Sequence, residues 1–262
     1  WARKPRRALV TAPTFAEYAT ALESVGCTVE RFFLREQEDF AVTDAFCAAI
    51  RPGVDMVFLC QPNNPTGQLT ALPLVEQILH RCAACGTLLV VDECFLDFLP
   101  DHALHTAKGL LGEGNLVILK AFTKLYGMAG VRLGYALSAD TALLEQMQAC
   151  GQPWGVSSLA QAAGLAALEE TAYVEKVRAL IAEQRPRLTA GLRALGLRVL
   201  DGRANYLLFQ APETLGEALR QRGAVLRSCA NYPGLGPGWY RTAVRTGPEN
   251  EQLLKLLAEV LE

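Results

Sequence analysis

Short apolar runs separated by helix-like stretches organise the first half of the chain. The runs with the length and apolar content of strands are 8–11, 28–33, 56–60, 88–91, 116–120 and 133–138. Helical spacing is found between them at 15–25, 44–50 and 72–85, and Gly26 and Gly86 end two of these stretches. Apolar strands without polar alternation, joined through helices, favour a mostly parallel sheet covered on both faces. The sequence therefore predicts an α/β fold.

The pattern changes after Pro153. Residues 157–192 read as one long helix, interrupted near Arg185 and Pro186 because proline removes a helical hydrogen bond. Short strands are expected at 198–200, 206–210, 224–227 and 240–245, with helices at 215–222 and 249–261. We therefore predict a large domain over 1–155, a connecting helix over 156–192 and a small C-terminal α+β domain over 193–262.

Polar side chains stand just beyond three of the expected strands. Asn64 lies in the Pro- and Asn-rich loop 61–67, Asp92 follows the run 88–91, and Lys124 follows the run 116–120. Ligands of such sheets bind at the carboxyl ends of the strands, so we expect these side chains to share one site. Arg132 follows Lys124 by eight residues, across a glycine-containing turn that lets the backbone return to the same place.

An amide, a carboxylate, an amine and a guanidinium in this order resemble the set that holds pyridoxal phosphate. Lys124 would bond to the aldehyde of that cofactor, and Asp92 would keep the ring nitrogen protonated so that the ring draws electrons. Asn64 would meet the ring hydroxyl, and the planar fork of Arg132 suits the phosphate. Thr123 would add a hydroxyl group to the phosphate site.

Each of these residues also has a structural interpretation. Asp92 could cap a helix, and Asn64 could build a turn before a proline. Lys124 and Arg132 could be ordinary surface residues. Phe15 could stack on the cofactor ring or pack in the core.

Two arginines in the C-terminal part lie on strand-like apolar runs, where a charge is costly unless it is paired. Arg241 and Arg227 could therefore bind a carboxylate and a second anion of a substrate, and surface placement is the alternative. Arg245 should share the strand face of Arg241, and its role stays open.

Composition excludes several classes of protein. The net charge is −2 and basic residues form no nucleic-acid footprint, while no apolar run reaches membrane-spanning length. The eight cysteines are scattered and Cys82-x-x-Cys85 lacks a second ligand pair, which favours free thiols in a reducing cytoplasm over a metal site. The chain opens with Trp1 rather than Met, so we expect an N-terminal segment to be missing.

The motifs together resemble the fold-type I pyridoxal-phosphate enzymes of aminotransferase class I and II. Longer segments are similar to the L-threonine-O-3-phosphate decarboxylases, which are related to the histidinol-phosphate aminotransferases. These segments are 92–100, 122–126, 152–154, 202–208 and 227–235. Phe95 also favours the resemblance to the decarboxylases, because aminotransferases of this group usually carry a tyrosine at this position that donates to the ring hydroxyl.

The resemblance implies a role for each candidate residue. Lys124 is the residue that bonds to the cofactor, Arg241 binds the substrate α-carboxylate and Arg227 binds the substrate phosphate. Tyr18 and Asn205 line the site, and Phe15 stacks on the ring. The resemblance further implies a homodimer that shares its site and acts on a small phosphorylated amino acid.

The leading hypothesis is decarboxylation of L-threonine O-3-phosphate to 1-aminopropan-2-ol O-phosphate in cobalamin biosynthesis. The main alternative is an aminotransferase acting on histidinol phosphate or a similar amine. A third is a non-catalytic effector-sensing domain fused to a DNA-binding motif, and no such motif is visible in the sequence. Ala121 departs from the family, where a Ser or Thr often contacts the cofactor phosphate, and the missing segment would carry a further phosphate-binding loop.

Overall fold

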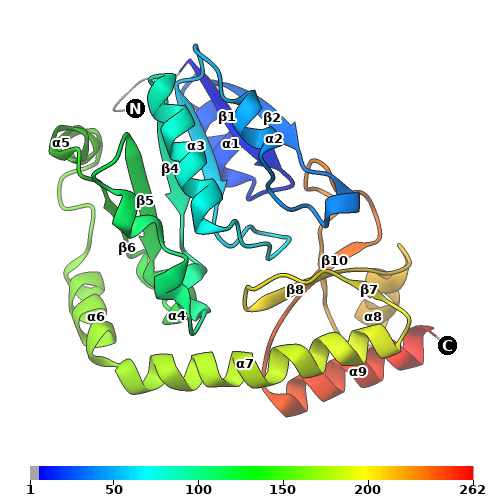
Figure 1. Cartoon of the computed structure of the whole chain (residues 1–262). Helices are drawn as coiled ribbons and strands as arrows, with labels where there is room; N and C mark the ends of the chain where they lie inside the picture. The colour runs from blue at the N-terminus through cyan, green and yellow to red at the C-terminus, as the bar shows by residue number, and fades with distance from the viewer. Residues whose placement is uncertain (1–5, 262) are drawn as a thin grey trace.

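Two sheets organise the protein, and the computed structural model describes residues 6–261 of it (Figure 1). The larger sheet has the strand order β2-β1-β3-β4-β5-β6. Its strands are β1 (Arg7–Ala12), β2 (Thr28–Phe33), β3 (Met56–Cys60), β4 (Leu88–Asp92), β5 (Leu116–Ala121) and β6 (Gly134–Leu137). Neighbours among β1 to β5 are parallel, and β6 runs antiparallel to β5. The predicted mostly parallel sheet is confirmed. Trp1, on which the expectation of a missing N-terminal segment rests, lies outside the described residues.

Helices cover both faces of the larger sheet. They are α1 (Glu17–Glu23), α2 (Ala45–Ala49), α3 (Leu72–Ala84) and α5 (Thr141–Cys150). On one face α2 and α3 pack against Leu89 and Val91 and their neighbours. On the other face α1 packs near Val10, and Leu143 of α5 packs against Val90. Successive strand residues thus meet opposite helix layers, which is why these strands are apolar throughout.

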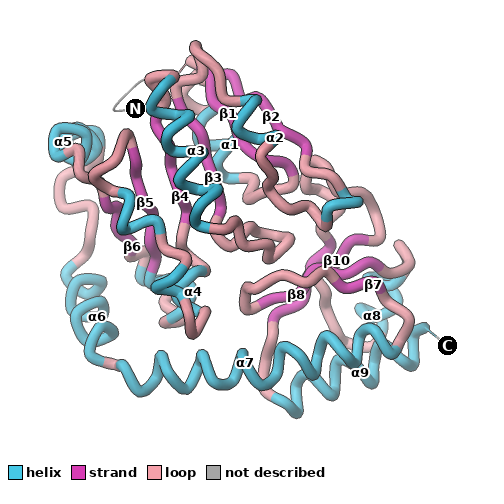
Figure 2. Tube along the Cα trace, viewed as in Figure 1, coloured by secondary structure: helices cyan, strands magenta, loops and turns pink. Residues whose placement is uncertain are grey.

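The smaller sheet is antiparallel, with the order β7-β8-β10-β9. Its strands are β7 (Arg198–Val199), β8 (Tyr206–Gln210), β9 (Arg227–Ser228) and β10 (Trp239–Ala243). Helices α7 (Thr171–Ala194), α8 (Leu215–Gln221) and α9 (Gly247–Leu261) pack on one side of it. Figure 2 shows the two groups of strands with α7 running beneath both.

A small apolar cluster joins the two sheets. Leu34 and Phe40, which follow β2, pack with Leu208 of β8 and Trp239 of β10. The rings of Phe40 and Trp239 meet edge to face at 5.5 Å between centroids. This contact holds the smaller sheet close to the ends of the larger one.

The helical connection differs from the expectation. The chain breaks at Glu170, between α6 (Ser158–Glu169) and α7, and not near Pro186, which lies inside α7. Ala182 and Pro186 are both exposed, so the carbonyl group that loses its helical partner can bond to water. The predicted strand 224–227 was also wrong over most of its length, because only its last residue belongs to β9. The division into two domains and a connecting helix stays a prediction.

The described part of the chain contains no helix both long and apolar enough to cross a membrane.

Candidate active site

A cavity of about 260 Å³ lies where β3, β4 and β5 end. The residues that line it are Phe15, Tyr18, Cys60, Asn64, Asp92, Cys94, Phe95, Ala121, Thr123, Lys124 and Arg132. The last residues of the three strands, Cys60, Asp92 and Ala121, are all in this set. Seven of the ten candidate residues therefore come together at the sheet edge at which parallel strands usually bind ligands.

Asp92 is held in one orientation by two donors. The hydroxyl group of Tyr18 donates to Oδ2 at 2.5 Å, and the backbone N–H of Cys94 donates to Oδ1 at 2.9 Å. Burial, reinforced by the nearby Cys60 and Asp92, raises the pKa of Tyr18 well above its usual value, so the phenol stays neutral and keeps its proton to donate. Its ring stacks on Phe58 with centroids 5.0 Å apart. Asp92 is thus a fixed carboxylate at the wall of the cavity.

Lys124 belongs to α4 (Phe122–Leu125), a single turn that starts where β5 ends. Its side chain is exposed to the cavity, and Nζ lies 5.5 Å from the centroid of the Phe95 ring, within reach of a cation–π contact. The Phe95 ring in turn packs edge to face on Tyr206 at 5.1 Å. Arg132 lines the same cavity, with a left-handed backbone (φ 59°). The turn between Lys124 and Arg132 therefore returns to one site, as the sequence predicts.

Asn64 contacts both the smaller sheet, through its amide oxygen, and the cavity, which its side chain lines. Its Oδ1 accepts hydrogen bonds from Nη1 of Arg241 and, at 3.5 Å, from the hydroxyl group of Tyr232. Within residues 6–261 its amide nitrogen donates to no protein group, and the side chain lines the cavity. The neighbouring Asn63 bonds to the backbone of Pro13 at 3.0 Å and fixes the loop. Asn64 therefore offers an N–H donor to a ligand.

The remaining three candidate residues lie outside the cavity wall. Arg241 of β10 donates a hydrogen bond to Asn64. Its guanidinium carbon lies 5.1 Å from the centroid of the Tyr206 ring. Arg227 of β9 lies over Tyr232 at 5.8 Å. Asn205 has its Oδ1 buried without a hydrogen-bond partner in the described structure.

The expectation for Arg245 was wrong. Strand β10 ends at Ala243, so Arg245 does not continue the strand face of Arg241. It lies in the turn before the body of α9 and pairs with Glu249 at 3.2 Å on the surface. We assign it no role in the site.

Sequence reasoning missed a largely buried ion-pair network next to the cavity-lining residues. Lys120, on β5, contacts Glu93 at 3.0 Å and Asp97 at 2.8 Å. A lysine inside an apolar strand was the available signal, since such a charge needs a buried partner. Cys60 and Cys94 also line the cavity without having been predicted, and burial raises the pKa of Cys60 to about 12.

The donor set fits pyridoxal phosphate. The Asp92 carboxylate suits the protonated ring nitrogen, the free N–H of Asn64 suits the ring hydroxyl, and the Lys124 amine suits the aldehyde. Arg132 and the hydroxyl group of Thr123 supply phosphate donors in the same cavity. Anionic and cationic groups are thus both present for a cofactor that carries both charges.

A mostly parallel sheet with this set of groups at the ends of its strands defines a fold-type I pyridoxal-phosphate enzyme. The chain belongs to the family of class I and II aminotransferases, whose sequence model matches residues 1–260. Enzymes of this family depend on pyridoxal phosphate.

Similar proteins fall into two groups within that family. The threonine-phosphate decarboxylase of Salmonella typhimurium is 40% identical over 262 residues, which cover 98% of this chain and 72% of that protein. The histidinol-phosphate aminotransferase of Lactiplantibacillus plantarum is 34% identical over 254 residues, covering 96% of this chain and 69% of that protein. The crystal structure of the histidinol-phosphate aminotransferase from Clostridium acetobutylicum superimposes with a TM-score of 0.93 at 26% identity, covering 99% of this chain and 79% of that one.

Proposed function

We propose that the protein decarboxylates L-threonine O-3-phosphate to 1-aminopropan-2-ol O-phosphate with pyridoxal phosphate as cofactor. The observation that carries this proposal is the placement of Arg241 and Arg227, which lie directly opposite each other on β10 and β9. Residues opposite each other in an antiparallel pair share a face, and like charges there repel. A substrate with two anionic groups a few bonds apart, a carboxylate and a phosphate, would relieve that repulsion.

The residues divide the work of the reaction. The bound cofactor supplies an electron sink for the charge that develops at Cα when carbon dioxide leaves. Arg241 holds the carboxylate and Arg227 the phosphate, and this two-point hold decides which bond at Cα is exposed to cleavage. Lys124, at the edge of the cavity, returns a proton to Cα, so the substrate loses carbon dioxide and gains a proton.

Transamination of histidinol phosphate is the second candidate, favoured by the 34% identity to an aminotransferase with that name. Histidinol phosphate carries one anionic group, which leaves one of the two paired arginines without a partner. The test is incubation with L-threonine O-3-phosphate and no 2-oxo acid, with products followed by mass spectrometry. Release of carbon dioxide with the amine retained supports decarboxylation, whereas turnover of histidinol phosphate that requires 2-oxoglutarate supports transamination.

Arg227→Gln should abolish the preference for a phosphorylated substrate. We expect kcat/KM for L-threonine O-3-phosphate to fall about a hundredfold, the typical result of removing one member of a charged pair. The slow reaction with unphosphorylated L-threonine should stay unchanged, because that substrate has no group for Arg227. Arg220→Gln, an exposed substitution on α8, is the matched control. Equal losses for the two substrates would argue against phosphate binding by Arg227.

We also propose that the protein forms a homodimer through α6 and the loop before it. Trp154 is 95% exposed, Leu159 83% and Leu165 69%, whereas the opposite side of α6 is buried against the protein. Apolar side chains clustered in this way on a surface usually mark an interface.

Leu159→Glu should convert the dimer to a monomer, because it would bury a charge in the interface. Analytical ultracentrifugation of the two forms at equal concentration provides the measurement. Leu104→Glu is the control, since Leu104 is 70% exposed and belongs to a different element, the short helix His102–Leu104. A dimer that persists in Leu159→Glu would exclude this surface.

The oxidation state of the cysteines indicates the kind of cellular compartment in which the protein works. All eight are free thiols, and Cys27, Cys60, Cys82 and Cys229 among them are buried. Free buried thiols support the proposal of a reducing compartment such as the cytoplasm.

A further inference from the structure

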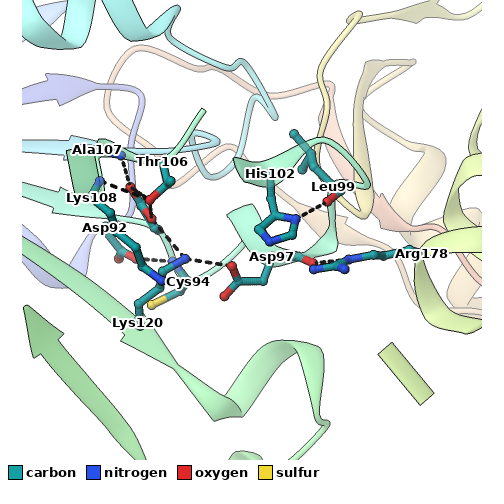
Figure 3. Close-up of polar contacts among 11 residues, drawn as sticks. Asp92, Cys94, Asp97, Leu99, His102, Thr106, Ala107, Lys108, Lys120 and Arg178 are labelled. Atoms are coloured by element: carbon teal, nitrogen blue, oxygen red, sulfur yellow. Dashed lines mark hydrogen bonds and ion pairs between the residues drawn. The ribbon is translucent and has the colours of Figure 1, made fainter. Parts of the chain in front are cut away.

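Lys120 forms ion pairs with Glu93 and with Asp97, and Figure 3 shows the contact with Asp97. The Lys120 side chain is 2% exposed and that of Glu93 0%, with 3.0 Å between Nζ and Oε2. Asp97 contacts the same ammonium group at 2.8 Å. Glu93 also accepts hydrogen bonds from the hydroxyl group of Thr106 at 2.8 Å and from the backbone N–H of Ala107 at 2.7 Å.

Fold stability alone is a weak reason for such a network. Desolvating charges costs free energy that the mutual attraction only partly returns, and apolar residues of similar volume often stabilise as well or better. Burial lowers the pKa of Lys120, but Glu93 and Asp97 outweigh burial and raise it above its ordinary value. The ammonium group therefore stays charged, and the network is a fixed ionic link.

The network lies where the two site-bearing strands separate. The last backbone hydrogen bond between β4 and β5 runs from Glu93 N–H to the carbonyl group of Leu119, at 2.9 Å. Beyond it, the ion pair between Glu93 and Lys120 continues the connection through side chains. Asp92 lies one position before Glu93, and Lys124 lies four positions after Lys120.

The network also anchors the segment that carries Phe95. Glu93 and Asp97 flank Phe95 in the sequence, and both are tied to Lys120. The carbonyl group of Asp97 accepts a further hydrogen bond from Arg178 of α7, at 3.0 Å. The ring of Phe95, held between these anchors, is the one that Lys124 contacts.

We propose that Lys120 is a positioning residue, which sets the separation between the Asp92 carboxylate and the Lys124 amine so that both can engage one cofactor. This inference rests on the proposed cofactor site and is independent of which substrate is used. Lys120 itself lines no part of the cavity and acts through Glu93 and Asp97.

The test is the affinity for pyridoxal phosphate, measured without substrate by titrating the cofactor absorbance. Lys120→Met should weaken binding about ten- to hundredfold, by analogy with the loss of an outer partner that orients a metal ligand. Reduction with borohydride, followed by peptide mapping, should also show less cofactor bonded to Lys124. Lys255→Met, the same substitution on the exposed side of α9, should bind like the unaltered chain. Binding of pyridoxal phosphate by the unaltered chain tests the proposed cofactor site. The ratio of the affinities of Lys120→Met and the unaltered chain tests the positioning role of Lys120.

A second variant separates positioning from stability. Lys120→Met leaves two carboxylates unpaired and can lower the melting temperature, whereas adding Glu93→Gln and Asp97→Asn removes those charges. We expect the triple variant to regain thermal stability and still bind the cofactor at least about tenfold more weakly. Full recovery of both stability and affinity in the triple variant would overturn the proposal. Undiminished affinity in Lys120→Met would overturn it as well.

Discussion

Lys124→Ala should lower the rate of decarboxylation by at least about a thousandfold, since removing a covalent nucleophile has effects of this size or larger. The substitution deletes both the amine that bonds to the cofactor aldehyde and the group that returns a proton to Cα. The fold should be retained, because the Lys124 side chain is exposed and approaches the Phe95 ring only to 5.5 Å. Mass spectrometry of the products from L-threonine O-3-phosphate measures the effect.

Two further measurements make the result specific to Lys124. Borohydride should attach the cofactor to the unaltered chain at Lys124 and leave Lys124→Ala unlabelled at the corresponding peptide. Lys255→Ala changes an exposed lysine of α9 and should react normally. Decarboxylation by Lys124→Ala at a rate near that of the unaltered chain would exclude the catalytic role that we assign to this residue.

Elements buried on both faces were the most predictable from the sequence. Strand β3 was predicted at its observed bounds, because every position meets one of two helix layers and must be apolar. Helix α5 was missed although its start is readable, since Asp140 caps it by accepting a hydrogen bond from Leu143 N–H at 2.9 Å. At Pro186 the sequence predicted a helix break that the structure does not have, because a proline on the exposed side of a long helix does not have to end it.

Position along the chain could predict part of the site but not all of it. Asn64 and Lys124 follow β3 and β5, and Asp92 ends β4 between them, so the neighbouring ends of these parallel strands bring the three residues together. The contact of Arg241 with Asn64 spans 177 residues and depends on how the smaller sheet packs against the larger one. No local pattern specifies that packing. The pairing of Arg227 with Arg241 is similar, because it depends on the register of two short strands.

The Asp92 carboxylate is the second group whose charge the reaction needs. Replacement by asparagine keeps the size and one of the two acceptor oxygens, but it removes the negative charge that favours a protonated ring nitrogen. We expect Asp92→Asn to reduce kcat about a hundred- to a thousandfold, comparable to the loss of one preorganised electrostatic group. KM should change much less, because Arg241 and Arg227, which we propose bind the substrate, are untouched.

This split between kcat and KM distinguishes the electronic role of Asp92 from a structural one. In Asp92→Asn the amide oxygen can accept from the backbone N–H of Cys94, and the amide NH2 can donate to the hydroxyl oxygen of Tyr18, so the melting temperature should stay close to that of the unaltered chain. Asp201→Asn removes a carboxylate that is 79% exposed and pairs with Arg193 on the surface, and it should leave kcat unchanged. A large fall in melting temperature with kcat preserved would mean that Asp92 acts as a helix cap or packing residue. A large fall in kcat in a stable protein would show that the reaction needs the charge of Asp92, because the two side chains are alike in size and differ in charge.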